Sequence, residues 1–491
     1  MANLAAIPPT RVRCLTAVDV RPEADYVVYW MNAFRRRRYN FSLQHACWHA
    51  EQLGKPLLVI EALRTGYRWA SDRFHRFVID GMRDNRRDFA GSAACYYPFL
   101  ETTSRRGHGF LEACCRHAAV LVADDYPAFF YPYLYDRIVS RWPVAVELVD
   151  SNGLLPMAVP DRTFTVAHSF RRYLQKELPR HLDDFPVSDP LEGLSLPPVV
   201  LPQSITRRWP PADLEDYAHG TANFDRFGID HSVPPVMGVS GGPQAAAETL
   251  QSFVADRLDR YPEDRNQPSL RGSSRISSYL HFGHLSAHEV FEQLTRQRGW
   301  KPEAIGAVNG KASGYWNAEP AVEAYLEELV TWRELGFNMC HRERDYDRWE
   351  SLPNWSRATL LKHAGDRREH HYTLEQLTRG ETSDELWNAA QRELLLEGRI
   401  QNYMRMYWGK RLLAWTPDPR MAMGYLIELN NRFALDGRDP NSYSGIMWVF
   451  GRYDRAWGPE RPTYGTVRYM SGDSTRRKFK LGDYLRRLAA S

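Results

Sequence analysis

The sequence predicts an α/β domain with a parallel, Rossmann-like sheet, followed by an all-helical domain. Three observations indicate this order. Apolar segments of strand length alternate with amphipathic segments in the first third of the chain, a Pro-rich stretch interrupts them, and helical periodicity prevails afterwards. At 491 residues the chain is too long for one ordinary hydrophobic core, which favours two domains.

Short apolar segments in the amino-terminal part have the length and composition of strands. They lie at residues 27–31, 57–60, 118–123 and 144–149, and an amphipathic segment at 41–53 separates the first two. Strands that alternate with helices favour a parallel sheet with both faces covered, and we place this domain at residues 1–185. No Gly-x-Gly-x-x-Gly motif follows the first strand, so the usual dinucleotide phosphate loop is not expected in it.

A change of composition separates this part from the rest of the chain. The stretch DFPVSDPLEGLSLPPVVLPQ is rich in Pro, Ser and Leu, which is typical of a linker, and we place an interdomain linker at residues 186–230. Beyond it, apolar residues recur at steps of three and four in the segments 245–258, 321–335, 387–397 and 402–413. We therefore expect a helical domain over residues 231–491.

The composition is that of a globular protein. No run of about 18 apolar residues occurs, and the first residues lack the apolar stretch of a secretory signal, so neither a membrane span nor secretion is expected. The six cysteines form no Cys-x-x-Cys pair, which fits a reducing cytosol or nucleus. A net charge of +4 favours a nucleic-acid partner only weakly. The chain is expected to be a monomer by default.

Aromatic residues are unusually abundant, at 13% of the chain with 15 Trp. Nine of the tryptophans fall after residue 315. Core packing explains most tryptophans in a typical protein, but this density also suits stacking on bases or electron transfer.

The segment from Gly272 to Gly283 is rich in serine. Small hydroxyl residues with free backbone N–H groups at the start of a helix make a site suited to phosphate groups. An ordinary Ser-rich turn is the alternative for this segment taken alone.

Glu328 and Trp332 are four residues apart, so one face of a helix would carry both. A carboxylate beside an indole can hydrogen-bond a pyrimidine while the ring stacks on it. A surface carboxylate beside a core indole is the alternative.

Trp408 and Trp415 are two helical turns apart and point roughly the same way, and Trp387 lies in the preceding helical segment. Aromatic residues at helical spacing usually belong to a core. Indoles that lie close together can also be oxidised in turn, which would carry electrons from the surface inward.

Two further segments combine polar and aromatic residues. Residues 429–441 place Gly437 between the carboxylates Asp436 and Asp439, where a tight turn is expected. In residues 443–458, two tryptophans flanked by arginine suit stacking on flipped bases together with a phosphate contact.

These five segments, in this order, resemble the class II cyclobutane pyrimidine dimer photolyases of the photolyase/cryptochrome family. The resemblance is loose before residue 230 and close from about 384 to 470, where the chain reads Leu-Asn-Asn-Arg-Phe-Ala-Leu-Asp-Gly-Arg-Asp-Pro-Asn and Asp-Arg-Ala-Trp-Gly. The chain differs from the family at Ser278, where Pro is usual, and at Asn431.

The resemblance implies light-driven repair of pyrimidine dimers in DNA, with FAD as cofactor, and leaves open an antenna chromophore of the deazaflavin or folate type in the amino-terminal domain. In the family, Asn430 faces the flavin N5 and Asp436 pairs with Arg405. The residues implied to hold FAD are Tyr261, Ser273, Ser274, Arg275, Ile276, Ser277, Trp332, Arg405, Asn430, Asp436 and Asp439.

The resemblance also implies which residues carry the reaction. Glu328, Met406 and Asn430 would be catalytic, and the DNA lesion would be bound by Glu328, Trp332, Trp448, Arg455 and Trp457. Trp408, Trp387 and Trp415 would form an electron-transfer chain. No metal is implied.

Two alternatives stay open at this point. A cryptochrome-like light sensor would bind FAD without repairing DNA, and a flavoprotein of the same fold could act on another substrate. The presence of Glu328, Trp448 and Trp457 argues against the sensor.

Overall fold

The computed structural model describes residues 4–139, 142–217 and 224–489. Two compact units interleave along the chain. The first comprises Met1–Val159, Leu178–Gln251 and Ile276–Gly299, and the second comprises Pro160–Glu177, Ser252–Arg275 and Trp300–Ser491. The boundaries expected at residues 185 and 231 stay a prediction, and residues 218–223 of the expected linker lie outside the described part of the chain.

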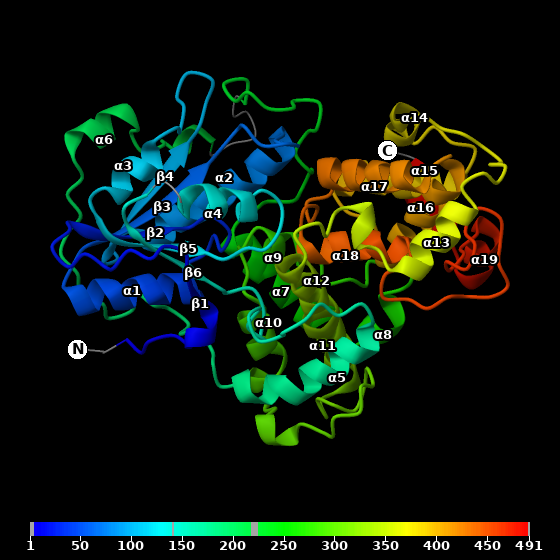
Figure 1. Cartoon of the computed structure of the whole chain (residues 1–491), viewed down its shortest axis with the longest axis horizontal. Coiled ribbons are helices and arrows are strands. Elements are labelled where there is room, and N and C mark those ends of the chain that lie inside the picture. Colours follow the sequence, from blue (N-terminus) through cyan, green and yellow to red (C-terminus); the bar gives the residue numbers. More distant parts are fainter. Residues whose placement is uncertain (1–3, 140–141, 218–223, 490–491) are drawn as a thin grey trace. The chain divides into compact units, whose positions relative to one another are not determined.

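The first unit is built on a six-stranded sheet with the order β1-β6-β5-β2-β3-β4 (Figure 1). Its strands are β1 (Val12–Cys14), β2 (Tyr26–Trp30), β3 (Leu57–Leu63), β4 (Ala94–Leu100), β5 (Ala118–Asp124) and β6 (Ala145–Val149). The four expected strands are present. The expectation of a purely parallel sheet is corrected at one edge, because β1 pairs with β6 in the antiparallel sense.

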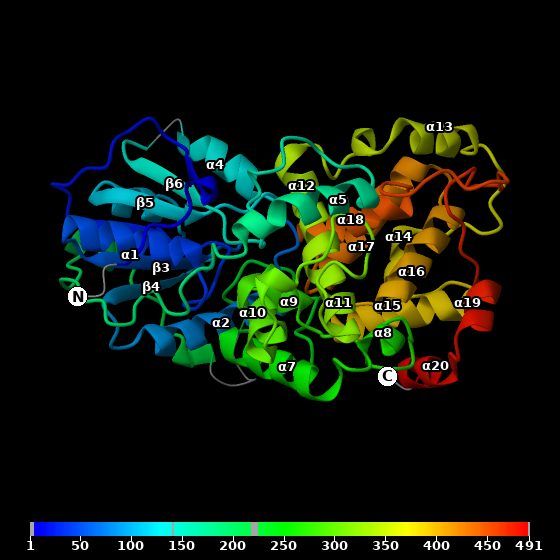
Figure 2. The same ribbon diagram turned by 90° about the horizontal axis from the view of Figure 1, so that it is seen from below.

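Both faces of this sheet are covered. Helix α1 (Phe41–Leu53) lies on one face, against a core that includes Val27 and Val122. The opposite face packs against α3 (Phe110–Cys115), α4 (Tyr131–Val139) and α6 (Gln203–Arg208) (Figures 1 and 2). The remaining helices are α2 (Asp72–Phe89), α7 (Pro243–Asp256, whose last turn enters the second unit), α9 (Ser277–His281) and α10 (Ala287–Leu294).

The Pro-rich segment packs closely on this unit. Leu191 is buried against the α1 side of the sheet, and Trp209 against the other side. Leu214 is buried in a third cluster with residues of α2. Because buried apolar side chains anchor it at several points, the described part of this segment is packed on the first unit and is not an unattached linker.

The second unit is helical, and the described residues contribute no strand to it. Its helices are α5 (Ala167–Glu177), α8 (Tyr261–Asp264), α11 (Pro320–Leu326), η6 (Glu327–Trp332), α12 (Arg333–Arg342), α13 (Asn354–Lys362), α14 (Leu374–Arg379), α15 (Glu385–Glu397), α16 (Asn402–Trp415), α17 (Pro419–Phe433), α18 (Pro440–Val449), α19 (Gly472–Lys478) and α20 (Gly482–Ala489). The helix expected at 321–335 is therefore present, but η6 is a π-helical turn within it.

Two glycines bring the central helices of this unit together. Helix α18 packs against α12 and α16. A Cβ atom on Gly336 of α12 would lie 2.8 Å from the Pro440 carbonyl oxygen, and one on Gly409 of α16 would lie 2.6 Å from Val449 Cγ2. Both helices approach α18 at distances that only glycine allows, since real Cβ contacts are not this short.

The described helices include none that is both long enough and apolar enough to span a lipid bilayer.

Candidate functional site

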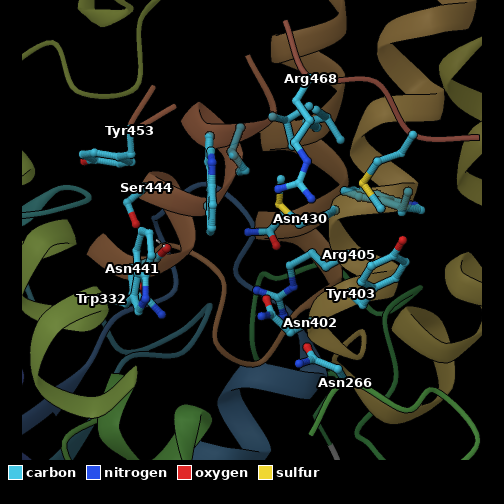
Figure 3. A pocket seen from close by; sticks show the side chains of 18 of the residues that line it. Asn266, Trp332, Asn402, Tyr403, Arg405, Asn430, Asn441, Ser444, Tyr453 and Arg468 are labelled. Atoms are coloured by element: carbon cyan, nitrogen blue, oxygen red, sulfur yellow. Dashed lines mark hydrogen bonds between the residues drawn. The ribbon is translucent and has the colours of Figure 1, made fainter. Parts of the chain in front are cut away.

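A cavity of about 370 Å³ lies in the second unit (Figure 3). Helices α16, α17 and α18 and the π-helical turn η6 contribute side chains to its wall. Seven of the residues singled out from the sequence line it: Glu328, Trp332, Arg405, Met406, Trp408, Asn430 and Trp448. Segments that are far apart in the sequence thus supply one site.

The turn η6 presents Glu328 and Trp332 to this cavity. A π-helical turn holds one residue more than an α-helical turn, and such turns occur often at functional sites. The step of four residues from Glu328 to Trp332 is therefore close to one full turn, and both side chains reach the same cavity. The two residues share a face as expected, but on a π-helical turn instead of an α-helix.

Glu328 is half-buried and paired. Arg265 Nη1 donates to Glu328 Oε1 over 2.6 Å. Burial raises the pKa of the Glu328 carboxyl, and the Arg265 guanidinium opposes that rise without cancelling it. The carboxyl group is thus held in place at the cavity wall by a cation, with its other oxygen available to a ligand.

Two indoles form an aromatic wall of the cavity. The rings of Trp332 and Trp448 stack with centroids 4.7 Å apart and planes inclined by 15°. Both side chains are only partly buried. Partly exposed stacked indoles offer a flat apolar surface on which a planar ring can stack.

The side chain of Asn430 points into the cavity from α17 (Figure 3). Its Nδ2 donates to Ser442 Oγ over 2.8 Å and to Asn431 Oδ1 over 3.2 Å. Asn431 in turn donates to the Tyr443 hydroxyl and accepts from the backbone N–H of Arg438. This network fixes the orientation of the Asn430 amide, and it directs Oδ1 to the cavity because both donor contacts use Nδ2.

Arg405 pairs with Asp436, as the family resemblance implies. Its Nη2 donates to Asp436 Oδ1 over 3.0 Å, so the guanidinium at the cavity wall is fixed by a carboxylate. Asp439 has a structural contact, since its side chain accepts from the backbone N–H of Asn441 as the N-cap of α18. Neither aspartate belongs to the cavity wall.

The serine-rich loop lies among arginines. Arg399 Nη1 donates to Ser273 Oγ and Arg257 Nη1 to the Ser273 carbonyl. Ser274 accepts from the Tyr325 hydroxyl, and Tyr325 packs edge-on against Tyr261 at 5.1 Å. Arg275 Nε and Nη2 are buried without a hydrogen-bond partner, although Glu397 lies within 3.8 Å of Nη2.

The charge of this loop suits an anion. Burial, together with the cations of Arg399 and Arg271, lowers the pKa of Arg275 to about 10. Buried guanidinium donors that lack partners favour the binding of a phosphate group. Ile276 and Ser277 belong to the first unit, in which Ser277 begins α9.

The three tryptophans expected to transfer electrons lie in contact. The ring centroids of Trp408 and Trp387 are 6.2 Å apart, and those of Trp387 and Trp415 are 5.5 Å apart. Trp408 lines the cavity, and its Nε1 donates to Gln391 Oε1. Trp387 Nε1 donates to the Trp408 carbonyl.

The expectation that this chain of indoles starts at the surface is corrected. Trp415 is only 2% exposed. The partly buried Tyr372 packs edge-on against it at 5.0 Å. The aromatic chain therefore reaches toward solvent through a tyrosine.

Two of the three lesion-binding candidates in the last segment, Arg455 and Trp457, lie outside the cavity wall. Trp457 is 40% exposed, and Arg455 lies 5.0 Å from its ring. Arg468, which does line the cavity, lies 5.5 Å from the same ring. Trp457 is thus a surface residue connected to the cavity through Arg468.

Several wall residues were not singled out from the sequence: Asn266, Asn402, Tyr403, Asn441, Arg468 and Lys478. Lys478 belongs to a run of basic residues, Arg476, Arg477, Lys478 and Lys480, so the sequence did carry a signal for it. Arg468 carried none, because single polar residues in loops are too common to indicate a site.

A second cavity, of about 290 Å³, lies in the first unit. Trp30, Ile60 and Phe99, near the carboxyl ends of β2, β3 and β4, line it together with Leu134 and Ile138 of α4. Open α/β sheets bind ligands at the carboxyl ends of their strands.

No protein-family model matches the chain. Proteins named deoxyribodipyrimidine photo-lyase are similar to it over nearly its whole length. It is 32% identical to the one from Arabidopsis thaliana, with 99% of this chain and 94% of the relative covered. The identity is 34% to the one from Oryza sativa (97% and 90% covered) and 31% to the one from Methanothermobacter thermautotrophicus (97% and 98% covered).

A solved structure with the same fold is the crystal structure of a bacterial class III photolyase from Agrobacterium tumefaciens. It matches with a TM-score of 0.66 and 16% sequence identity, and the match covers 97% of this chain and 88% of that chain. At this identity the likeness concerns the fold alone. It confirms an α/β part followed by a helical part.

One buried cation near the site is unusual. Lys410 of α16 is 1% exposed, and its Nζ donates to the Val449 carbonyl over 2.5 Å. Burial lowers the pKa of this lysine to about 7. Between pH 7 and the ordinary lysine pKa, the unfolded chain therefore binds a proton that the native chain has released, so stability rises with pH over this range.

We expect the Lys410→Met variant to lose this pH dependence. Between about pH 7 and about pH 8.5 the wild type should gain about 1.5 kcal/mol of unfolding free energy relative to the variant. Urea unfolding followed by tryptophan fluorescence at both pH values measures the difference. Lys362→Met, which removes an exposed lysine, should keep the wild-type slope. An equal slope in Lys410→Met would contradict the assignment.

Proposed function

The chain belongs to the deoxyribodipyrimidine photo-lyase family, and we propose that its cavity binds FAD and pyrimidine dimers for light-driven repair of DNA. Similarity over nearly the whole length to three photo-lyases carries this conclusion and confirms the family expected from the sequence. The relatives' names favour repair over light sensing alone.

The residues of the second unit fit FAD. A flavin nucleotide needs an anion site for its diphosphate and polar groups for its ring. This unit offers buried guanidinium donors without a hydrogen-bond partner at Arg275, beside Ser273 and Ser274. Arg405 and Asn430, each fixed by a neighbour, lie at the wall of the cavity. When bound, reduced FAD supplies on photoexcitation the electron that splits the cyclobutane ring and accepts it again afterwards.

The aromatic wall and Glu328 suit the lesion. A pyrimidine dimer must leave the base stack to reach the cavity, as in other enzymes that act on flipped bases. The indoles of Trp332 and Trp448 would then stack on it, and the carboxyl group of Glu328 would hydrogen-bond a pyrimidine edge. Met406 lines the same wall and would contact the lesion as a flexible apolar group.

The surface beside the cavity suits the DNA backbone. Arg455, Trp457 and Arg468 form a group in which two cations flank one exposed indole. Lys478 adds a further cation at the cavity wall. Phosphate contacts of this kind make the affinity fall with rising salt concentration.

The indole chain would restore the reduced state of the cofactor. Trp408, at the cavity wall, would give up an electron first and recover it through Trp387 and Trp415. The two short steps between rings, at 6.2 and 5.5 Å, support this order. Tyr372 lies beyond Trp415 as the last aromatic group before solvent.

The cavity of the first unit suits an antenna chromophore of the deazaflavin type. Its wall is mainly apolar and contains Trp30, Phe99, Phe110 and Trp142, and Arg137 is one of its polar lining residues. A planar aromatic ligand could stack there at the carboxyl end of the sheet.

Photorepair tests the proposed function. We expect the purified protein to release FAD, and no FMN, when it is denatured. It should repair a thymine dimer in light but not in darkness.

The Glu328→Ala variant should lower the repair yield per photon more than it lowers the affinity for DNA, because the contact of Glu328 strengthens as charge develops on the dimer. Trp457→Ala should instead weaken binding of dimer-containing DNA by about 1–3 kcal/mol, the value of one stacked base.

The control for this experiment is Glu381→Ala, which removes an exposed carboxylate and should repair like the wild type. A wild-type protein that binds damaged and undamaged DNA equally and repairs neither would refute the repair function and favour a light sensor.

The electron path is tested separately from repair. Trp408→Phe should slow photoreduction of the oxidised flavin strongly, since it removes the indole at the cavity wall. Repair by chemically pre-reduced enzyme should stay largely intact. Transient absorption measures the first rate, and Trp349→Phe, a buried tryptophan outside the chain of indoles, serves as the control. Unchanged photoreduction in the Phe variants of all three indoles would assign them to the core alone.

Reconstitution tests the antenna. The holoenzyme should retain an added 5-deazaflavin through gel filtration, and its repair per incident photon should rise where the deazaflavin absorbs. Ala62→Trp, which fills the cavity of the first unit, should abolish retention while FAD stays bound. Equal retention by the variant, or none by the wild type, would place no antenna in this cavity.

A further inference from the structure

A carboxylate occupies a core-facing position of strand β6. Side chains alternate along a strand, and Ala145 and Val149 belong to the core beneath α1 whereas Val146 and Leu148 belong to the opposite core. Glu147 therefore faces α1. A carboxylate at such a position loses hydration, so it requires hydrogen-bond donors or a cation.

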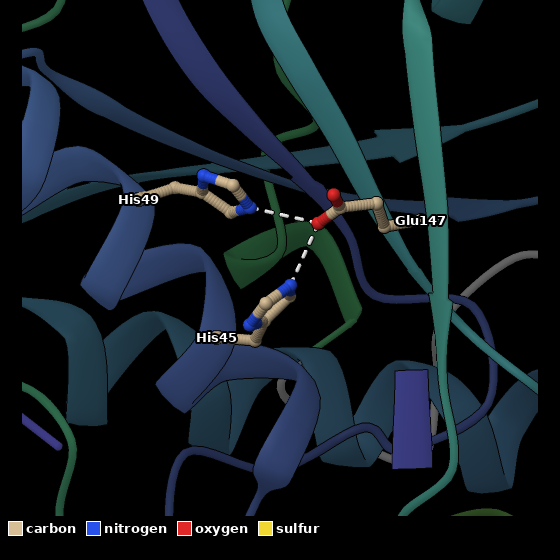
Figure 4. Close-up of side chains that lie close together, drawn as sticks. All are labelled: His45, His49 and Glu147. Carbon is tan, nitrogen blue, oxygen red and sulfur yellow. Dashed lines mark hydrogen bonds and ion pairs between the residues drawn. The ribbon is translucent and has the colours of Figure 1, made fainter. Parts of the chain in front are cut away.

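Helix α1 meets this carboxylate with two histidines. His45 and His49 are four residues apart on the helix and project toward β6 (Figure 4). The Nε2 atoms of both rings lie 2.7 Å from the same atom, Glu147 Oε2. The side chains are 9%, 9% and 16% exposed, so the group is nearly buried but still reachable from solvent.

The ring of Trp48 restrains both imidazoles. It stacks on His45 with the planes inclined by 5° at 5.8 Å, and it packs edge-on against His49 at 4.9 Å. The two Nε2 atoms are thus held in position before any ligand arrives. Such preorganisation lowers the entropic cost of binding.

This geometry is close to that of a metal site. One ligand atom from each of the three residues lies within 4.8 Å of the others. A tetrahedral zinc ion at about 2.0–2.1 Å from its ligands sets them about 3.3 Å apart, so small movements of the side chains would admit the ion. Two imidazoles and one carboxylate are also the three protein ligands of many zinc sites that keep one position for water.

We propose that His45, His49 and Glu147 bind one divalent transition-metal ion, with Zn²⁺ as the physiological choice and water as the fourth ligand. Imidazole and carboxylate ligands in a tetrahedral arrangement suit Zn²⁺. The ion joins α1 to β6 and compensates the buried carboxylate. It lies in the first unit and acts on the stability of that unit, separately from the repair chemistry.

The experiment uses the untagged holoenzyme, stripped of metal with a chelator and then titrated with ZnCl₂ by calorimetry. The wild type should bind one Zn²⁺ ion tightly. Glu147→Gln and His49→Gln should each weaken this binding at least tenfold, because each removes one ligand. Glu147→Gln keeps the volume and an acceptor oxygen for both imidazoles, so it should fold and retain FAD like the wild type.

His117→Gln is the matched control. His117 also contacts a carboxylate of the first unit, with Nδ1 3.0 Å from Asp25 Oδ2, but it lies outside the group of three. This variant should bind Zn²⁺ like the wild type. A second readout is thermal: Zn²⁺ should raise the melting temperature of the wild type and the control, and leave that of Glu147→Gln unchanged.

Two results would overturn the proposal. One is a wild type that binds no more Zn²⁺ than the His49→Gln/Glu147→Gln double variant. The other is equal loss of binding in His117→Gln, which would indicate adventitious surface coordination.

Discussion

The close approach of α18 to α12 and α16 is the constraint on which the functional unit depends. Gly336 and Gly409 leave no room for a Cβ atom, so α12 meets the backbone of α18 and α16 meets the Val449 side chain of α18. This contact brings Trp448 of α18 against Trp332 and sets Lys410 beneath the Val449 carbonyl. The aromatic wall of the cavity follows from the absence of two methyl groups.

A second principle is that the polar groups at the cavity are held by other side chains. Arg405 is held by Asp436, Glu328 by Arg265, and Asn430 by Ser442. Side chains with such partners lose little freedom when a ligand arrives, which favours tight and specific binding. The indoles are positioned in the same way, since Trp408 and Trp387 each donate their N–H to a buried acceptor.

Much of this organisation could be predicted from the sequence. The four strands 27–31, 57–60, 118–123 and 144–149 have apolar runs of the right length, and the helices of the second unit have clear periodicity. Strand β4 was not predicted, because Pro98 argues against a strand unless it lies at an edge, as it does here. The antiparallel β1 was missed because three residues carry too little pattern.

The site residues were found through ordered motifs, whereas their partners were not. Arg468 reaches the cavity from a segment without a local pattern, and the burial of Trp415 depends on packing that no spacing reveals. His45 and His49 have the spacing of ligands on one helix face, but their third partner, Glu147, is about a hundred residues away and becomes visible only in the folded sheet.

The π-helical turn η6 has a consequence for how this activity is inherited. Such a turn amounts to one amino acid inserted into an α-helix, and deleting one amino acid between 327 and 332 would restore regular helical geometry. The helices on both sides of the turn would keep their register, because the bulge that holds the extra residue would be removed. Only the residues of the turn itself would change direction, so the placement of Glu328 and Trp332 at the cavity wall would be altered while the packing of α12 would be preserved. The loss of a single codon would therefore keep the fold and impair the activity. Descendants of this gene could in this way become light-binding proteins that do not repair DNA.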